Sequence, residues 1–149
     1  MTAPIKRHLS LQSLSRDHHE GLLIAFKIEK GMSENVEASV MQKHIDWFFE
    51  KKLKPHFKIE EEVVFPVLGN DHELVRAALD QHAELVRLFG INEKDYTTLK
   101  SIGELLDAHI RFEERILFNE IQAAATPEQL QLIEASHNNS PNPTHKASN

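Results

Sequence analysis

The 149-residue chain contains no cysteine and few residues that interrupt helices. The absence of cysteine excludes disulfides, thiolate metal sites, iron–sulfur clusters and cysteine nucleophiles. Only five glycines and six prolines are present, and two of the prolines fall in the final segment, SHNNSPNPTHKASN. No segment alternates apolar and polar residues with a period of two, so β-strands are not expected. The composition therefore favours an all-helical protein without thiol chemistry.

Long apolar runs and an excess of positive charge are also missing. No run approaches the roughly 18 apolar residues of a transmembrane helix, and the N-terminal MTAPIKRHLSLQS lacks the apolar core of a signal peptide. The formal net charge of −6 argues against nucleic acid or an anionic membrane as the main partner. We therefore expect a cytoplasmic protein with no nucleic-acid partner and no membrane partner.

Apolar residues recur at steps of three and four in four long segments, which predicts four amphipathic helices in one domain. The expected helices cover about 10–31, 34–68, 72–89 and 96–124. Gly31 is expected to end the first helix, Pro55 to kink or break the second, and Asp71 to cap the third. Because the links are short, the sequence predicts an up-down-up-down antiparallel four-helix bundle.

The C-terminal region predicts a further short helix and a tail. Thr126, Pro127 and Gln129 are typical of an N-cap, a first helical residue and a capping-box partner. They predict a helix that runs to about residue 136. The polar, turn-rich residues 137–149 predict a disordered tail. The expected organisation is therefore one domain over 1–136 followed by a tail over 137–149.

One motif occurs twice. The stretches HFKIEEEVVFPVL (56–68) and HIRFEERILFNEI (109–121) share the pattern His-x-x-x-Glu-Glu-x-x-apolar-Phe. Ten histidines in one chain is a high count, and this repetition places two of them in matched surroundings. The pattern therefore justifies a search for a site that uses both copies.

The first glutamate of each motif shares a helix face with the histidine before it. His109 has Ile116 and other apolar residues at helical spacing, so it is expected to point into the bundle, and Glu113 lies four residues on. His56 and Glu60 repeat this arrangement. An inward carboxylate without a partner would be costly, so each motif is typical of a metal site.

The other two helices each supply one inward histidine. His82 lies on the apolar face of the third helix. The first helix offers His18 or His19, and the apolar residues four and seven positions away favour His18, with His19 as the alternative. Glu61 and Glu114, the second glutamates of the motifs, fall off the inner face and are expected to be solvated or paired with Arg and Lys.

These inward side chains have the composition of a dinuclear metal site. Carboxylates can bridge two cations, and imidazoles suit iron, zinc, copper and nickel. Glu60 and Glu113 would bridge both metals, and two histidines would complete each side. One or two positions on each metal would remain for water, hydroxide or an external ligand. The predicted ligands are His18 and His56 on one side, His82 and His109 on the other, with Glu60 and Glu113 between them.

A metal-free bundle is the alternative interpretation. A single core histidine is more often packed through hydrogen bonds than bound to metal, and a single Glu four residues after a His often only pairs with it. Two matched motifs and two further inward histidines together favour the metal site. No role in the site is expected for His8, His44, His72, His137 and His145. Phe65 and Phe118 are expected to be core residues.

Four segments carry a resemblance to a known family. SRDHHEGL, HFKIEEEVVFPVL, LDQHAEL and HIRFEERILF, in this order, resemble the hemerythrin-like family, also called the His-His-Glu cation-binding domain, over about 11–121. The resemblance implies an up-down four-helix bundle with a non-haem di-iron centre and a bridging oxo or hydroxo group. Manganese and zinc are the alternative metals. The six ligands carried over by the resemblance are His18, His56, Glu60, His82, His109 and Glu113.

The chain departs from the oxygen-carrying members of that family. Those have His-x-x-x-His on the third helix and His-x-x-x-x-Asp on the fourth. Here Ala78 and Val86 flank His82 at four residues, and Glu113 follows His109 at four. One histidine is missing and an open metal position is gained, which disfavours simple reversible oxygen carriage.

The expected function is that of a di-iron protein that binds or reacts with oxygen, peroxide or nitric oxide. Catalytic turnover, if the protein has it, would be oxidase-like or peroxidase-like. The alternative is an iron-storage, sensing or signalling module without turnover.

Overall fold

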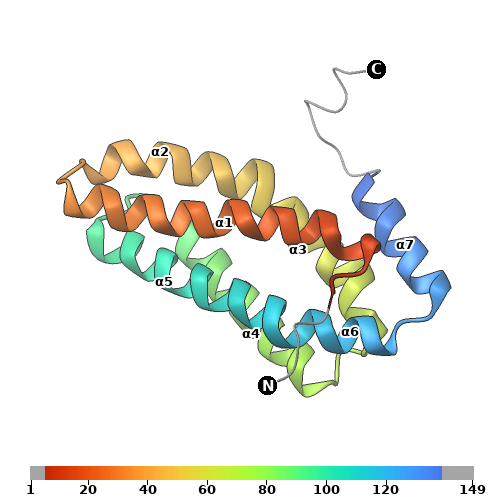
Figure 1. The fold of residues 1–149 in the computed structure, drawn as a ribbon. Coiled ribbons are helices and arrows are strands. Elements are labelled where there is room, and N and C mark those ends of the chain that lie inside the picture. The colour runs from red at the N-terminus through yellow and green to blue at the C-terminus, as the bar shows by residue number, and fades with distance from the viewer. Residues whose placement is uncertain (1–5, 139–149) are drawn as a thin grey trace, which may run out of the picture.

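The computed structural model describes residues 6–138, and every regular element in that range is helical, which confirms the all-helical class (Figure 1). The α-helices are α1 (Leu9–Ser33), α2 (Ala38–Phe48), α3 (Lys54–Ile59), α4 (Glu73–Phe89), α5 (Tyr96–Phe112), α6 (Phe118–Ala124) and α7 (Pro127–Asn138). The π-helical turns are η1 (Phe49–Leu53), η2 (Glu60–Val64) and η4 (Glu113–Leu117), and η3 (Phe65–Val67) is a 3-10 turn.

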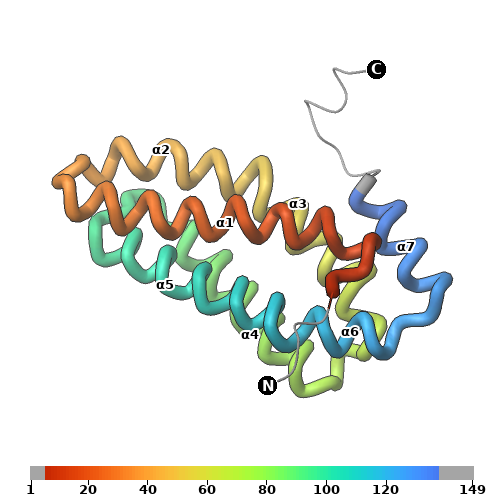
Figure 2. The backbone as a smooth tube through the Cα atoms, in the orientation of Figure 1, coloured from red at the N-terminus to blue at the C-terminus, as the bar shows by residue number. Residues whose placement is uncertain are grey.

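The elements combine into four long rods that lie side by side (Figure 1). One rod runs from α2 through η1 and α3 to η2, another runs from α5 through η4 to α6, and α1 and α4 are the other two. Figure 2 shows α7 at the end of the molecule where α1 begins, and α7 packs against α1 and η2. Within residues 6–138, no helix combines the length and the apolar character needed to cross a membrane.

Two helix boundaries differ from the sequence prediction. Gly31 does not end α1 but lies inside it, against the Met41 side chain, where a Cβ would collide with the sulfur. The helix ends two residues later, before Asn35, whose φ of 60° leaves the helical region. The N-cap of α4 is His72 and not Asp71, because His72 Nδ1 accepts the backbone N–H of Leu74 at 3.1 Å.

The predicted irregularity before His56 is present as a π turn. In η1 the backbone N–H of Lys54 bonds the carbonyl of Phe49, five residues earlier. Pro55, which has no N–H to donate, then occupies the first turn of α3, directly after the π turn that shifts the hydrogen-bond register.

The predicted start of α7 is confirmed by a reciprocal cap. Gln129 N–H donates to Thr126 Oγ1 at 3.1 Å, and Thr126 N–H donates to Gln129 Oε1 at 2.9 Å. The helix runs on to Asn138, past the expected end at 136. Of the predicted tail, residues 137 and 138 therefore belong to α7, and 139–149 lie outside the described residues.

Two apolar clusters fill the bundle, one on each side of a polar layer. The first contains Ile24, Ile28, Phe48, Leu85, Leu99 and Leu106, and the second contains Leu11, Leu14, Val64, Val75, Leu117 and Ile133, each with further members. Along α1 and along α4 the chain passes from the second cluster to the first. Along the rod from α2 to η2 and the rod from α5 to α6 it passes from the first cluster to the second. Between the clusters, every rod contributes buried histidine or glutamate.

Candidate metal centre

The six residues expected to bind metal come together in the polar layer. Each of them is no more than 3% exposed. They are His18, His56, Glu60, His82, His109 and Glu113. The structure places His18 in this cluster, whereas His19 lies exposed on the outside of α1.

The Nε2 atoms of the four histidines face the two glutamates. Each glutamate faces one histidine of the His18–His56 pair and one of the His82–His109 pair. Glu60 Oε2 lies 3.1 Å from His56 Nε2, and Glu60 Oε1 lies 3.0 Å from His82 Nε2. Glu113 Oε1 lies 2.8 Å from His18 Nε2, and Glu113 Oε2 lies 3.3 Å from His109 Nε2. Each carboxylate therefore spans the layer, with one oxygen toward either side.

The donors form two groups of four that share both glutamates. Position A consists of His18, His56, Glu60 and Glu113, and position B consists of His82, His109, Glu60 and Glu113. Within each group the ligand atoms all lie within 4.8 Å of one another. Each position thus offers two imidazole nitrogens and two carboxylate oxygens, the arrangement that the sequence predicts.

Six buried atoms of this layer make no hydrogen bond within the part of the chain that the structure describes. They are both carboxylate oxygens of Glu60 and of Glu113, together with Nε2 of His82 and of His109. The nitrogen–oxygen distances are short, but none of these six atoms makes a contact that meets hydrogen-bond geometry. Since buried polar groups are normally satisfied, a cation at each position fits this donor set.

The outward Nδ1 atom of each histidine has its own partner. The pairs are His18 with Glu114 at 2.6 Å, His56 with Asp17 at 3.0 Å, His82 with Glu61 at 2.8 Å and His109 with Gln81 at 2.5 Å. An Nδ1–H that donates to such an oxygen fixes the ring and leaves the Nε2 lone pair directed inward. This is the usual arrangement around metal-bound histidine.

These outer partners extend one prediction. Glu61 and Glu114 lie off the inner face as expected, and the Glu61 side chain is 44% exposed, but each also accepts a hydrogen bond from a histidine of another rod, which was not expected. Glu114 also pairs with Arg7 at 3.4 Å, so that part of the prediction is confirmed. The sequence signal for Glu61 and Glu114 as histidine partners was the pair of adjacent glutamates, which occurs in both motifs.

Two π turns begin at the glutamates of the layer. In η2 the N–H of Phe65 bonds the carbonyl of Glu60, and in η4 the N–H of Phe118 bonds the carbonyl of Glu113, five residues apart in each case. Both phenylalanines are fully buried, as predicted. The wider turn also changes which side chains point inward, so Ile116, expected on the inner face, is 47% exposed.

The Phe residues contact the histidine rings. The Phe118 ring stacks on His18 with the ring centroids 5.2 Å apart, and Phe65 lies 5.4 Å from His82. These contacts close the layer on the side of the second apolar cluster.

Burial and mutual contact shift the pKa values of the layer in the metal-free chain. Burial alone lowers the pKa of His56, but the charge of Glu60 and the contact with Asp17 outweigh it and raise the pKa to about 9. Burial likewise opposes protonation of His82, and contacts with Glu113, Glu60 and Glu61 raise its pKa to about 11. The pKa of His18 is also raised, mainly by Glu113 and Glu114 against the effect of burial.

The pKa of Glu113 moves in the opposite direction. Burial raises the pKa of this carboxyl, but the histidines around it, His109 first, hold the pKa well below its usual value. In the metal-free chain these shifts favour protonated His18, His56 and His82 against ionised Glu113 at neutral pH. A cation must displace the protons on Nε2 in order to bind.

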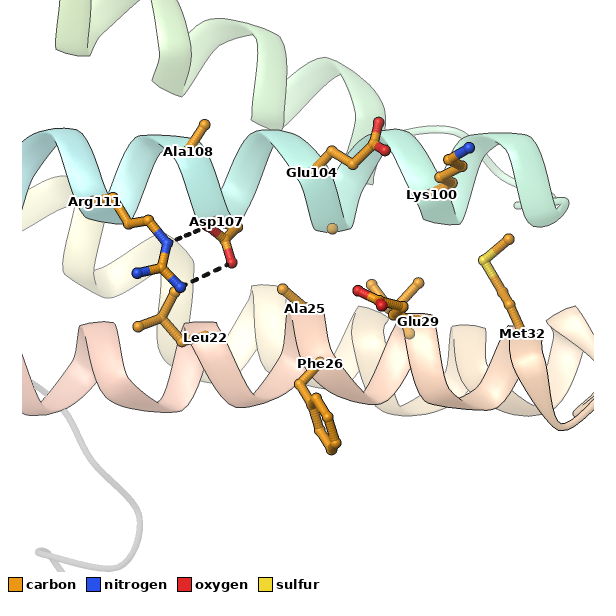
Figure 3. A pocket seen from close by; sticks show the side chains of 12 residues that line it. Leu22, Ala25, Phe26, Glu29, Met32, Lys100, Glu104, Asp107, Ala108 and Arg111 are labelled. Carbon is orange, nitrogen blue, oxygen red and sulfur yellow. Dashed lines mark hydrogen bonds and ion pairs between the residues drawn. The ribbon is translucent and has the colours of Figure 1, made fainter.

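A large surface hollow lies away from this layer. It is a groove of about 770 Å³ between α1 and α5, with apolar Leu22, Ala25 and Met32 and a hydrogen-bonded pair of Arg111 and Asp107 at its rim (Figure 3). None of the six predicted ligands lines it. Its size therefore says nothing about the chemistry of the polar layer.

A much smaller cavity touches position A. It has a volume of about 10 Å³, room for one water-sized molecule. Its lining residues are His18 and His56, with Asp17, Gly21, Phe48, Lys52, Leu53 and Ile110.

At position B the corresponding space is filled. Phe57 directly follows His56 and lies face to face with the His82 ring, with 3.7 Å between the centroids. The equivalent residue after His109 is Ile110, which is smaller. The two positions therefore differ in how much room they leave beside the predicted ligands.

A buried layer of histidine and glutamate inside a helical bundle defines the class of the protein as a metal-binding helical domain. Residues 10–121 match the Hemerythrin HHE cation binding domain, and the chain belongs to this family. The match confirms the resemblance of the four segments. Neither curated proteins nor solved structures gave a significant match.

Proposed function

We propose that the protein is a non-haem di-iron protein that binds or reacts with oxygen, peroxide or nitric oxide. The observation that carries the proposal is the pair of four-donor groups that share Glu60 and Glu113. His18 and His56 would hold the metal at position A, and His82 and His109 would hold the metal at position B. When bound, the metal pair would supply Lewis-acid and redox chemistry.

The surrounding chain orients the ligands and excludes water. The outer partners fix each imidazole ring, and the apolar clusters on both sides of the layer keep bulk solvent away. The cavity beside position A has room for about one water molecule, so only a ligand of a few atoms fits there without a large rearrangement. This size supports a diatomic or peroxide ligand and argues against a larger organic substrate.

Iron is the metal we propose because the donor set of nitrogen and oxygen suits it and the chain belongs to a cation-binding family. Manganese and zinc are the rival metals. We also infer an up-down-up-down order of the rods, since the two apolar clusters alternate along successive rods. A cytoplasmic location, without nucleic acid or membrane as partner, is part of the same proposal.

Metal analysis of protein expressed with added iron tests this function. Two iron ions per chain are expected, and His109→Ala should lose most of them. His44→Ala is the matched control, because His44 stacks on Trp47 outside the layer with the ring centroids 5.9 Å apart. Less than about one metal per chain in the unaltered protein would contradict the proposal.

Storage, sensing or signalling without turnover is the second candidate function. It is favoured by the small size of the cavity at position A, which leaves no room for an oxidisable organic substrate. Reaction of the reduced protein with excess peroxide separates the two functions. Repeated turnover excludes the second candidate, whereas stoichiometric binding supports it.

A further inference from the structure

The two metal positions differ in the outer partners of their histidines. Asp17 and Gln81 occupy equivalent places, each directly before the one histidine of its rod that lies in the polar layer. Asp17 accepts from His56 at position A with a carboxylate, whereas Gln81 accepts from His109 at position B with a neutral amide. At position A, both histidines therefore donate to a carboxylate. At position B, only His82 does, because the partner of His109 is an amide.

Asp17 has a second partner from the other end of the chain. Asp17 Oδ2 lies 3.0 Å from His56 Nδ1 and 3.1 Å from Nε2 of His137, a residue 120 positions away in α7. His137 lies beyond the residues that match the family, 10–121. Ile133, fully buried in the second apolar cluster, anchors α7 one turn earlier and sets His137 over Asp17.

Position B lacks a corresponding contact in the described residues. The side chain of Glu61 is 44% exposed, and its only hydrogen bond there is the one with His82. Among the described residues, the Gln81 side chain likewise hydrogen-bonds only with His109. At position A, by contrast, Glu114 is also held by Ser15 Oγ at 2.7 Å.

We propose that His137 is a positioning residue that acts through Asp17 on His56 and makes position A the tighter of the two metal positions. The inference rests on the proposed function only in that the chain binds two metals. The side chain of Asp17 is 31% exposed, so without His137 it is free to turn toward solvent. With two N–H groups donating to one oxygen, Asp17 stays in place and holds the His56 ring in its ligating orientation.

A titration of the metal-free chain with Co²⁺, followed by visible absorption, tests the inference. The unaltered chain is expected to bind in two steps of different affinity. His137→Ala and His137→Asn should weaken the tighter step about 10-fold and leave the other unchanged. His137→Gln should restore the tighter step, because its amide nitrogen reaches about as far as Nε2, whereas the Asn amide is too short.

Two further variants make the test specific. Gln81→Glu gives His109 a carboxylate partner and is expected to bring the two steps closer together. His44→Ala, a surface histidine outside the layer, should bind like the unaltered chain. The far-UV circular dichroism of the helices identifies any variant that fails to fold. If His137→Ala fails to fold, the polar variants His137→Gln and His137→Asn decide the outcome.

The outcomes separate this inference from the proposed function. If the unaltered chain binds neither Co²⁺ nor iron, both the inference about His137 and the proposed function are overturned. Normal two-step binding by the unaltered chain, with both steps unchanged in His137→Ala and His137→Asn, overturns only the role of His137. Equal weakening of both steps in the Ala, Asn and Gln variants also overturns it, since that result indicates a general effect on the fold.

Discussion

The carboxylate of Glu61 lies 2.8 Å from Nδ1 of His82, so the second glutamate of one motif supports a histidine on a different rod. Glu114 does the same for His18 at 2.6 Å. The two adjacent glutamates of each motif thus have separate tasks. The first faces the metal positions, and the second orients an imidazole across the bundle.

Loss of this outer support is expected to weaken metal binding without removing a ligand. Glu61→Ala leaves the His82 ring without its acceptor, and changes of this kind typically cost about 10- to 100-fold in metal affinity. Competition with a chelator measures the effect. Glu62→Ala is the control, since Glu62 is adjacent and exposed and should behave like the unaltered chain. Equal affinities of all three proteins would contradict the assigned role.

Replacement of a shared glutamate is expected to affect both positions at once. Glu113→Gln replaces one of the two shared carboxylates by an amide, so the metal content should fall from two per chain to one or fewer. Elemental analysis gives the content, and Glu120→Gln, an exposed position on the same rod, is the control. Two metals retained in Glu113→Gln would show that Glu113 does not bridge.

The stability of the metal-free chain is expected to fall as the pH rises above neutrality. The pKa of His56 is raised to about 9 and that of His82 to about 11, from an ordinary value near 6.5. Such groups contribute stability that is complete below about 6.5, the pKa of an unfolded histidine, and is lost as the pH rises through the folded values. Thermal unfolding between pH 6 and pH 10 should therefore show a declining midpoint.

The metal-loaded chain is not expected to show this decline, because above about pH 6.5 the ligand Nε2 atoms carry no proton in either the metal-bound or the unfolded chain. Protons compete with the cation for Nε2, so metal binding and the stability it adds increase with pH. The difference between the two midpoints should widen from pH 6 to pH 9. Parallel curves with and without metal would indicate that the cation binds elsewhere.

Access for a small ligand is expected to depend on Gly21. A Cβ at this position would lie 2.6 Å from Cδ1 of Ile110, and both residues line the cavity at position A. Gly21→Ala should therefore fill the cavity, cost about 1–3 kcal/mol through overpacking, and slow the binding of peroxide or nitric oxide about 10-fold. The metal content should not change. Stopped-flow absorption measures the rate, and an unchanged rate would mean that ligands enter by another route.

Most of the metal centre could be predicted because its signals are local in the sequence. A spacing of four residues puts His56 with Glu60, and His109 with Glu113, on one face whatever the rest of the chain does. The cap formed by Thr126 and Gln129 is local in the same way. Where the backbone leaves the regular α-helix the prediction failed, as at Ile116, because a π turn changes the periodicity on which the prediction depends.

By itself, the sequence determined the helical class, the four segments and five side chains of the polar layer, and it narrowed the sixth to His18 or His19, since each follows from helical periodicity and residue chemistry. Only the tertiary structure decided which histidine each outer acceptor supports, the space left beside position A and the approach of His137 to Asp17. These contacts join residues up to 120 positions apart, and their formation depends on how the rods pack. Local periodicity carries no information about that packing.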